Sequence, residues 1–269
     1  MNKKNKTNYF KNIFAKEIKL GINVIIEPSA IIRGLKGDAN QIIIGDNVYI
    51  GNDVQIICDN FIIGDYGKIH HHTNIHGYKP CSIGHNAWIG QYSIIDSIGG
   101  TTIGNNCGIG AHSQLWSHIK YGDTMEGCRY NSSSELIIGN DVWFVGHCIV
   151  SPIKAEDKSM ALIGSVITKN MAYNEIYAGS PAKSISDKVG YQFEERTVEE
   201  KLVLMKEYLV ESGINRNKIK IVKNVDEFKK DGCSYFAVKT RHYLKTRNKE
   251  EIEFMKFLLP EKAKFTPYE

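Results

Sequence analysis

The most regular feature of the sequence is an aliphatic residue at every sixth position, often followed by Gly. The pattern is clearest between residues 103 and 169, where Ile-Gly pairs begin at Ile103, Ile109 and Ile138. A small residue or Val tends to fall four positions after the aliphatic one. A period of six fits neither a helix nor a plain strand, so it indicates a structural repeat.

A repeat of six residues has a direct physical interpretation. Each unit forms one short strand and a turn, and three units close a triangular coil of roughly eighteen residues. The aliphatic side chain points into the coil, the small residue fills the corner, and Gly, Asn and Asp serve the turn. Because one coil cannot bury its own apolar face, several must stack. The sequence therefore predicts an all-β solenoid.

The repeat divides the chain into three parts. It occupies residues 22–189, interrupted by a loop at 119–135. Residues 1–21 are polar, with Phe10, Ile13, Phe14 and Ile18 at helical spacing, which predicts a short amphipathic helix or arm covering the first coil.

Residues 190–269 lack the repeat and predict a small α+β appendage that caps the C-terminal end of the solenoid. A capping box at 197–200 begins a helix that ends near Gly213. Strands are expected near 219–222 and 233–239, followed by a second helix at 248–257. The appendage is locally basic, which also favours contact with an anionic glycan. The basic residues are Lys218, Lys220, Lys223, Lys239, Arg241, Lys245 and Arg247.

Composition narrows the class of protein. The net charge is +4, and no basic block is interleaved with aromatic residues, so nucleic acid is not an expected partner. The six cysteines are scattered without a CxxC pair, which favours reduced thiols. No apolar run reaches about 18 residues and the N-terminus lacks a signal-peptide core, so we expect a cytoplasmic protein without a membrane span.

Four features together resemble one enzyme family. They are the repeats, the loop that ends in Asp141-Val142-Trp143, the segment GSVITK at 164–169 and the segment AGSPAK at 178–183. They resemble the hexapeptide-repeat acetyltransferases, whose fold is a left-handed parallel β-helix, over residues 22–186. His118 and Trp143 are similar to residues of bacterial O-acetyltransferases that modify surface polysaccharides, including sialic acid polymers. The resemblance implies acetyl-CoA as co-substrate, a glycan acceptor, and a homotrimer with active sites between subunits.

Acetyl transfer to a sugar needs a base, because a hydroxyl is a poor nucleophile at neutral pH. The resemblance assigns this role to His118. Alignment of the coils places His118 in an outward column with Tyr78 and Ile98. The neighbouring column holds the residues His76, Asp96 and Trp116. Since stacked coils lie about 4.8 Å apart, Asp96 is expected to orient the imidazole, with an ordinary turn residue as the alternative.

Further site residues follow from the resemblance, each with a structural alternative. Trp143 packs at the acyl site and donates its indole N–H, or simply covers a coil edge. Trp116 forms a wall for a sugar ring, or packs on the surface. In the loop, Arg129 pairs with an acceptor carboxylate, or with a carboxylate of the loop itself, and Tyr130 lies beside it. Coenzyme A is expected at Gly146, Gly164, Ser165, Thr168, Lys169 and Lys183.

Two alternatives to an acetyltransferase are a metal-dependent enzyme and a structural solenoid. The same fold carries metal-dependent carbonic anhydrases with three His ligands, and the spacing of His76, His112 and His118 resembles theirs. Those enzymes lack the long loop and the Asp-Val-Trp segment, so we expect no metal. A purely structural solenoid accounts for the repeat but not for His118 or the segment at 178–183.

Overall fold

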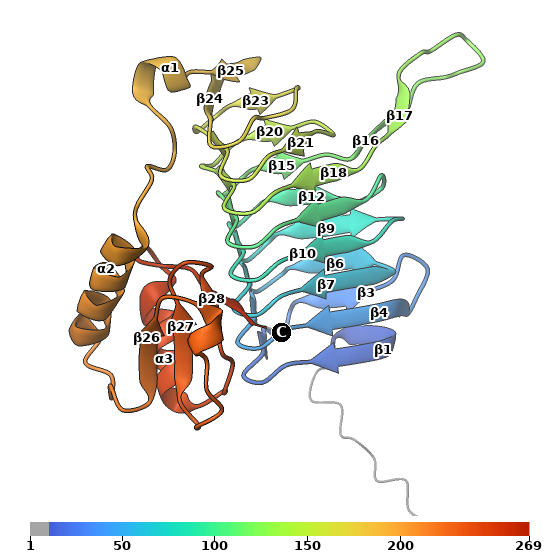
Figure 1. Ribbon diagram of the computed structural model, residues 1–269. Helices are drawn as coiled ribbons and strands as arrows, with labels where there is room; N and C mark the ends of the chain where they lie inside the picture. The colour runs from blue at the N-terminus through green and yellow to red at the C-terminus, as the bar shows by residue number, and fades with distance from the viewer. Residues whose placement is uncertain (1–10, 269) are drawn as a thin grey trace, which may run out of the picture. The chain divides into compact units, whose positions relative to one another are not determined.

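The computed structural model describes residues 11–268 and divides into two compact units, 1–193 and 194–269. The first unit is a stack of triangular coils made of parallel strands, which confirms the predicted hexapeptide β-helix (Figure 1). Its coils have three faces. The first face contains β3 (Ile31–Arg33), β6 (Gln55–Cys58), β9 (Asn74–Gly77), β12 (Ile94–Asp96), β15 (Gln114–Leu115), β20 (Ile149–Val150) and β23 (Val166–Ile167).

The other two faces complete each coil. The second face contains β4 (Ala39–Ile44), β7 (Asn60–Ile63), β10 (Cys81–Ile83), β13 (Thr101–Ile103), β18 (Leu136–Ile138) and β21 (Lys154–Ala155). The third face contains β2 (Ile25–Ile26), β5 (Tyr49–Ile50), β8 (Lys68–Ile69), β11 (Trp88–Ile89), β14 (Gly108–Ile109), β19 (Trp143–Phe144), β22 (Met160–Ala161) and the antiparallel pair β24 (Ile176–Gly179) and β25 (Ala182–Ser184). The short helix α1 (Ser186–Val189) follows.

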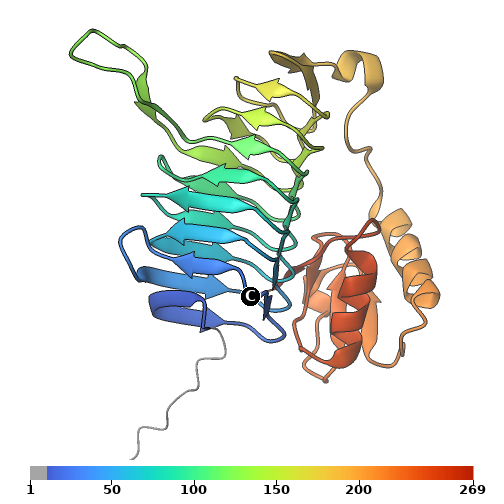
Figure 2. The same ribbon diagram turned by 180° about the vertical axis from the view of Figure 1, so that it is seen from behind.

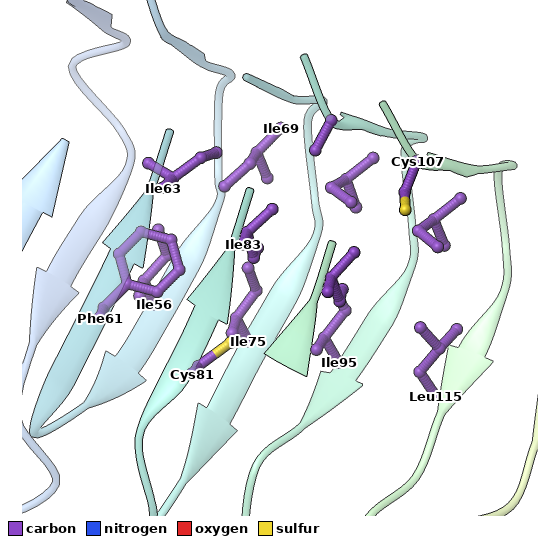
Figure 3. Close-up of a cluster of buried hydrophobic side chains, with 14 of the residues drawn as sticks. Ile56, Phe61, Ile63, Ile69, Ile75, Cys81, Ile83, Ile95, Cys107 and Leu115 are labelled. Carbon is purple, nitrogen blue, oxygen red and sulfur yellow. The ribbon is translucent and has the colours of Figure 1, made fainter. Parts of the chain in front are cut away.

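The aliphatic residues of the repeat form the core, as predicted. On the first face, Ile56, Ile75, Ile95 and Leu115 are in register on successive coils, and all four are fully buried (Figure 3). Burying one such side chain stabilises the fold by about 1.5–3 kcal/mol. Burial also raises the pKa of the Cys58 thiol to about 12, so this thiol stays protonated near neutral pH.

A ladder of polar side chains holds one corner of the stack. Each backbone N–H there donates to a side chain of the next coil: Asp46 N–H to Asp65 Oδ1 at 2.8 Å, His85 N–H to Asn105 Oδ1 at 2.8 Å, and Asn140 N–H to Asp157 Oδ1 at 2.7 Å. These bonds satisfy backbone donors that the turns leave unpaired. The Asn and Asp residues of the repeat therefore fix the spacing of the coils.

The N-terminal segment is not the helix that was one of the two alternatives expected for it. Residues Ile13–Leu20 form a strand, β1, and not an amphipathic helix; Phe10 lies outside the described residues. β1 pairs in parallel with β3 and then with β4. The first coil has open strand edges, and a strand satisfies their donors and acceptors where a helix cannot. The tertiary partner therefore overrides the local helical spacing.

The second unit contains a four-stranded sheet: β26 (Ile219–Val222), β27 (Ser234–Ala237), β28 (His242–Tyr243) and β29 (Thr266–Pro267). Its helices are α2 (Val198–Glu211), the short 3-10 helix η1 (Val225–Glu227) and α3 (Lys249–Leu258). Helix α2 begins with the predicted capping box between Thr197 and Glu200. Helix α3 covers one side of the sheet (Figure 2). The rings of Phe254 and Phe236 pack there, with 5.2 Å between their centroids.

Candidate functional site

A buried carboxylate lies at the end of β12. Asp96 has no exposed surface, and its Oδ2 accepts three hydrogen bonds. The donors are His118 Nδ1 at 2.8 Å, Ser117 N–H at 2.8 Å and Ser117 Oγ at 2.7 Å. The structure therefore brings Asp96 and His118 together. The orientation of His118 by Asp96 was the role expected from the sequence, and the burial of Asp96 was not predicted.

The contact with Asp96 fixes the state of the His118 ring. An ionised carboxylate only accepts hydrogen bonds, so in the neutral ring Nδ1 of His118 carries the proton and Nε2 has the lone pair. The His118 side chain is 18% exposed and is the first residue of β16 (His118–Lys120). β16 pairs with β17 (Asn131–Ser133) to form an arm that extends from the coils (Figure 1). A basic nitrogen thus lies at the foot of this arm, between the first and second faces.

Two neighbouring residues were not singled out from the sequence. The Ser117 Oγ that donates to Asp96 also accepts the Gly99 N–H at 2.9 Å. A Cβ on Gly99 would lie 2.2 Å from the Ser117 carbonyl oxygen and 2.5 Å from that of Ser134, so only glycine fits there. The pair Gly99-Gly100 before β13 was the available signal in the sequence, because close backbone approach is a common reason for glycine.

The opposite oxygen of Asp96 faces a second imidazole. His76 Nε2 lies 3.6 Å from Asp96 Oδ1, and His76 Nδ1 lies 2.8 Å from Asn74 Oδ1. The third candidate metal ligand, His112, lies at another corner, stacked between the rings of Tyr92 and His147. Within residues 11–268, no three His, Cys, Asp or Glu side chains are grouped to hold a metal ion.

The two tryptophans lie at different places. The Trp116 ring is 6.1 Å from that of His118, between centroids, at an interplanar angle of 64°. Trp143 lies on the third face, where its Cδ1 would be 3.0 Å from a Cβ on Gly108 of the neighbouring coil. In a triangular coil the third face is opposite the corner that holds His118. One chain therefore does not bring Trp143 to His118.

Several polar side chains of the arm are exposed to solvent. Tyr130 is 73% exposed, and Arg129 is also exposed. Asp123 Oδ1 accepts the backbone N–H groups of Met125 and Glu126. Arg129 has no ion pair with any other residue in the described part of the chain, so the loop-internal pair considered from the sequence is not formed. Its guanidinium is available to an external anion.

The predicted coenzyme A residues lie in three places. Thr168 and Lys169 follow β23, at the corner that holds His118. Gly146 and Gly164 lie at the corner between the third and first faces, where the Gly164 N–H donates to the Gly146 carbonyl at 3.0 Å. Lys183 lies on β25.

Two side chains near the corner that holds Gly146 and Gly164 are buried and do not face a ligand. Ser165 is fully buried, and its hydroxyl donates to the Leu162 carbonyl at 2.6 Å, so its side chain does not face a ligand. Burial raises the pKa of the neighbouring Cys148 thiol, which excludes it as a ready nucleophile. Gly164 is open, because a Cβ there would meet no other atom within 4 Å. Open space at this corner is therefore found beside Gly164, whereas a Cβ on Gly146 would lie 3.4 Å from the Ala111 carbonyl oxygen.

Fold and site define a hexapeptide-repeat β-helix that carries a carboxylate-oriented imidazole. No family model matches the chain. It is 26% identical over 200 residues to the bifunctional protein GlmU of Listeria monocytogenes serotype 4a (strain HCC23), which covers 65% of this chain and 40% of GlmU. GlmU of Baumannia cicadellinicola is 27% identical over 179 residues, covering 60% of this chain and 37% of that protein. The chain thus spans about two fifths of the length of these curated relatives.

Solved structures of similar fold include three acyltransferases. AntD, an N-acyltransferase from Bacillus cereus in complex with dTDP and 3-hydroxybutyryl-CoA, has a TM-score of 0.42 and 15% identity over 72% of this chain and 90% of AntD. The polySia specific acetyltransferase NeuO has a TM-score of 0.42 and 19% identity over 72% and 93% of the two chains. The polysialic acid O-acetyltransferase OatWY has a TM-score of 0.34 and 22% identity over 71% and 98%.

The structure also bears on membrane insertion. Among the helices of residues 11–268, none combines the length and apolarity that crossing a bilayer requires.

Proposed function

We propose that the protein transfers an acetyl group from acetyl-CoA to a hydroxyl of a bacterial surface glycan, with His118 as general base. The observation that carries this proposal is the 2.8 Å contact between His118 Nδ1 and the buried Asp96 carboxylate, which orients the ring and leaves Nε2 as the nitrogen that can accept a proton. A base held in one tautomer by a buried carboxylate is the arrangement that activates hydroxyl nucleophiles.

The proposed reaction balances with these residues. Nε2 of His118 takes the proton as the acceptor oxygen attacks the thioester carbonyl, and the imidazolium is stabilised by Asp96. The carbon–sulfur bond then breaks, and the proton passes from His118 to the leaving thiolate. The products are an acetyl ester and free coenzyme A. The Lys169 ammonium, at the same corner and free of ion pairs to other described residues, would bind a phosphate of the coenzyme.

We further propose that the acceptor is an acidic sugar. The exposed arm carries Arg129 and Tyr130 above the foot where His118 lies, a cation and an aromatic ring that suit an acidic sugar. Sialic acid polymers have this chemistry, and the sequence resemblance points to them. The subunit arrangement is proposed to be a homotrimer, for the same reason.

The test is release of coenzyme A from acetyl-CoA in the presence of glycans, including polysialic acid. We expect turnover with an acidic glycan and none without acceptor. His118→Ala should lower turnover by about two to four decades while the protein stays folded. Near wild-type turnover in that variant would end the proposal, and so would the absence of turnover across neutral and acidic glycans.

A further inference from the structure

The second unit contains a cavity that the proposed reaction does not use. It has a volume of about 500 Å³ and lies between helix α2 and strand β26. Its apolar lining includes Leu209 of α2 and Ile219 of β26, both buried, and the ring of Tyr235 from β27. This volume is within the range of small-molecule sites, and it exceeds what a single inorganic anion fills.

Four cations converge on this cavity from four different segments. Lys206 comes from α2, Arg216 from the loop before β26, Lys220 from β26, and Lys229 from the loop after η1. All four are exposed. None of them forms an ion pair or a side-chain hydrogen bond with another residue of the described chain. The convergence is therefore a property of the folded unit and not of one basic run of sequence.

The contrast with other lysines of this unit is informative. Lys223 pairs with Glu199 at 2.9 Å, and Lys262 pairs with Glu211 at 2.8 Å. The carboxylate in the cavity lining, that of Glu227, accepts the backbone N–H groups of residues 223 and 224. It is therefore engaged in capping η1 and balances only part of the four positive charges. A concave surface of one sign focuses its field on a ligand of the other sign.

We propose that this cavity binds an acidic sugar unit of the glycan acceptor. A pyranose ring has an apolar face that suits Leu209, Ile219 and Tyr235, while its anionic group meets the cations at the rim. The identity of the polymer rests on the proposed function, but the chemistry of the cavity does not. Of the seven basic residues that the sequence singled out in this part, only Lys220 lines the cavity.

Binding is tested with the full chain and without acetyl-CoA, by calorimetry. The probes are polysialic acid, whose charges are carboxylates, and a teichoic acid, whose charges are phosphodiesters; neutral dextran is the blank. The cavity variant combines Lys206→Gln, Arg216→Gln and Lys220→Gln. We expect it to weaken binding of at least one acidic probe by tenfold or more.

A matched control variant removes three exposed charges of the same unit that do not line the cavity, Lys230→Gln, Lys239→Gln and Lys256→Gln. It should change binding by less than about twofold, because exposed charges beyond the cavity are screened by salt. Equal losses in the two variants, or no binding of either acidic probe by the wild type, would overturn the proposal.

A kinetic measurement separates this proposal from the proposed reaction. The cavity variant should raise KM for a long acidic polymer at least fivefold, with kcat and the rate on a free acidic monosaccharide unchanged. If the wild type binds polymer through the cavity but transfers no acetyl group, the cavity stands and the transferase proposal fails. If transfer occurs and the cavity variant keeps wild-type KM and binding, the cavity proposal fails alone.

Discussion

Replacement of Asp96 by Asn tests whether the buried carboxylate supports the reaction at His118. Asn has nearly the same shape, and its amide oxygen can still accept the Ser117 N–H and Oγ–H, so the corner keeps its packing. What is lost is the negative charge 2.8 Å from His118 Nδ1. A hydrogen bond to a charged group contributes about 1.5–3 kcal/mol.

That magnitude sets the expected rate. Since about 1.4 kcal/mol corresponds to one decade, kcat/KM should fall by about 10- to 150-fold. The assay is coenzyme A release under saturating acetyl-CoA, with thermal unfolding as a check on the fold. A matched control is Asp123→Asn on the arm, which removes a carboxylate that contacts only backbone N–H groups and not His118. It should retain turnover within about twofold.

A double variant makes the test stricter. If Asp96 acts through His118, Asp96→Asn should cost nothing further in a protein that already carries His118→Ala. A kcat/KM of Asp96→Asn within twofold of wild type, in a folded protein, would refute the positioning role. Additive losses in the double variant would show that Asp96 acts on the reaction by another route.

Three further predictions concern the fold and the chemistry. Phe144→Ala should lower the free energy of unfolding by about 3–5 kcal/mol in urea titrations, because the ring is fully buried in the coil; an unchanged midpoint would contradict that packing. Gly108→Ala should displace the Trp143 indole, whose Cδ1 lies 3.0 Å from the added Cβ, and shift its fluorescence without changing stability by more than about 1 kcal/mol; an unshifted spectrum would speak against the contact. Turnover should survive dialysis against a chelator, and stoichiometric zinc with activity lost on its removal would favour the anhydrase-like alternative.

The register of these coils was predictable because the aliphatic-Gly pattern resumes in each coil, although Ile56, Ile75 and Ile95 are 19 and 20 residues apart and not 18. Once Ile75, Ile95 and Leu115 are assigned to the interior, His76, Asp96 and Trp116 are expected in one column, and the strand pairing places His76 opposite Asp96. The segment at 154–157 lacks the Ile-Gly pattern, yet it keeps register, because Ala155 takes the inward place below Ile138. Strand pairing with the neighbouring coil thus carries the repeat through a weak unit.

Other features depend on contacts that a period does not encode. Residues Ile13–Leu20 have helical spacing, but the open edges of β3 and β4 select a strand. The full burial of Asp96 depends on Ser117, whose backbone N–H and hydroxyl both donate to the carboxylate. The cavity beside Lys206 is formed by one α-helix, the short 3-10 helix η1, two strands and two loops, so the count of basic residues did not locate it.

The placement of Trp143 leads to a final prediction. His118 lies at the corner between the first and second faces, and Trp143 lies on the third face, opposite that corner. If both side chains act on one acetyl group, they must come from two copies of the chain. A closed ring of identical subunits meets this requirement, because each interface then joins two different surfaces. The proposed trimer would therefore pair His118 of one protomer with Trp143 of its neighbour.

This arrangement predicts complementation between inactive variants. His118→Ala and Trp143→Ala should each lower turnover at least tenfold. Co-expressed in equal amounts and mixed at random, they should recover about a quarter of wild-type turnover per site. Half of the sites have an intact His118 on one side, and half of those have an intact Trp143 on the other side. Mass spectrometry verifies that mixed oligomers form, and co-expression of His118→Ala with itself in two tagged forms gives the baseline. Mixed oligomers without recovery would place both functions in one chain or exclude Trp143 from the reaction, and full turnover of Trp143→Ala alone would exclude it directly.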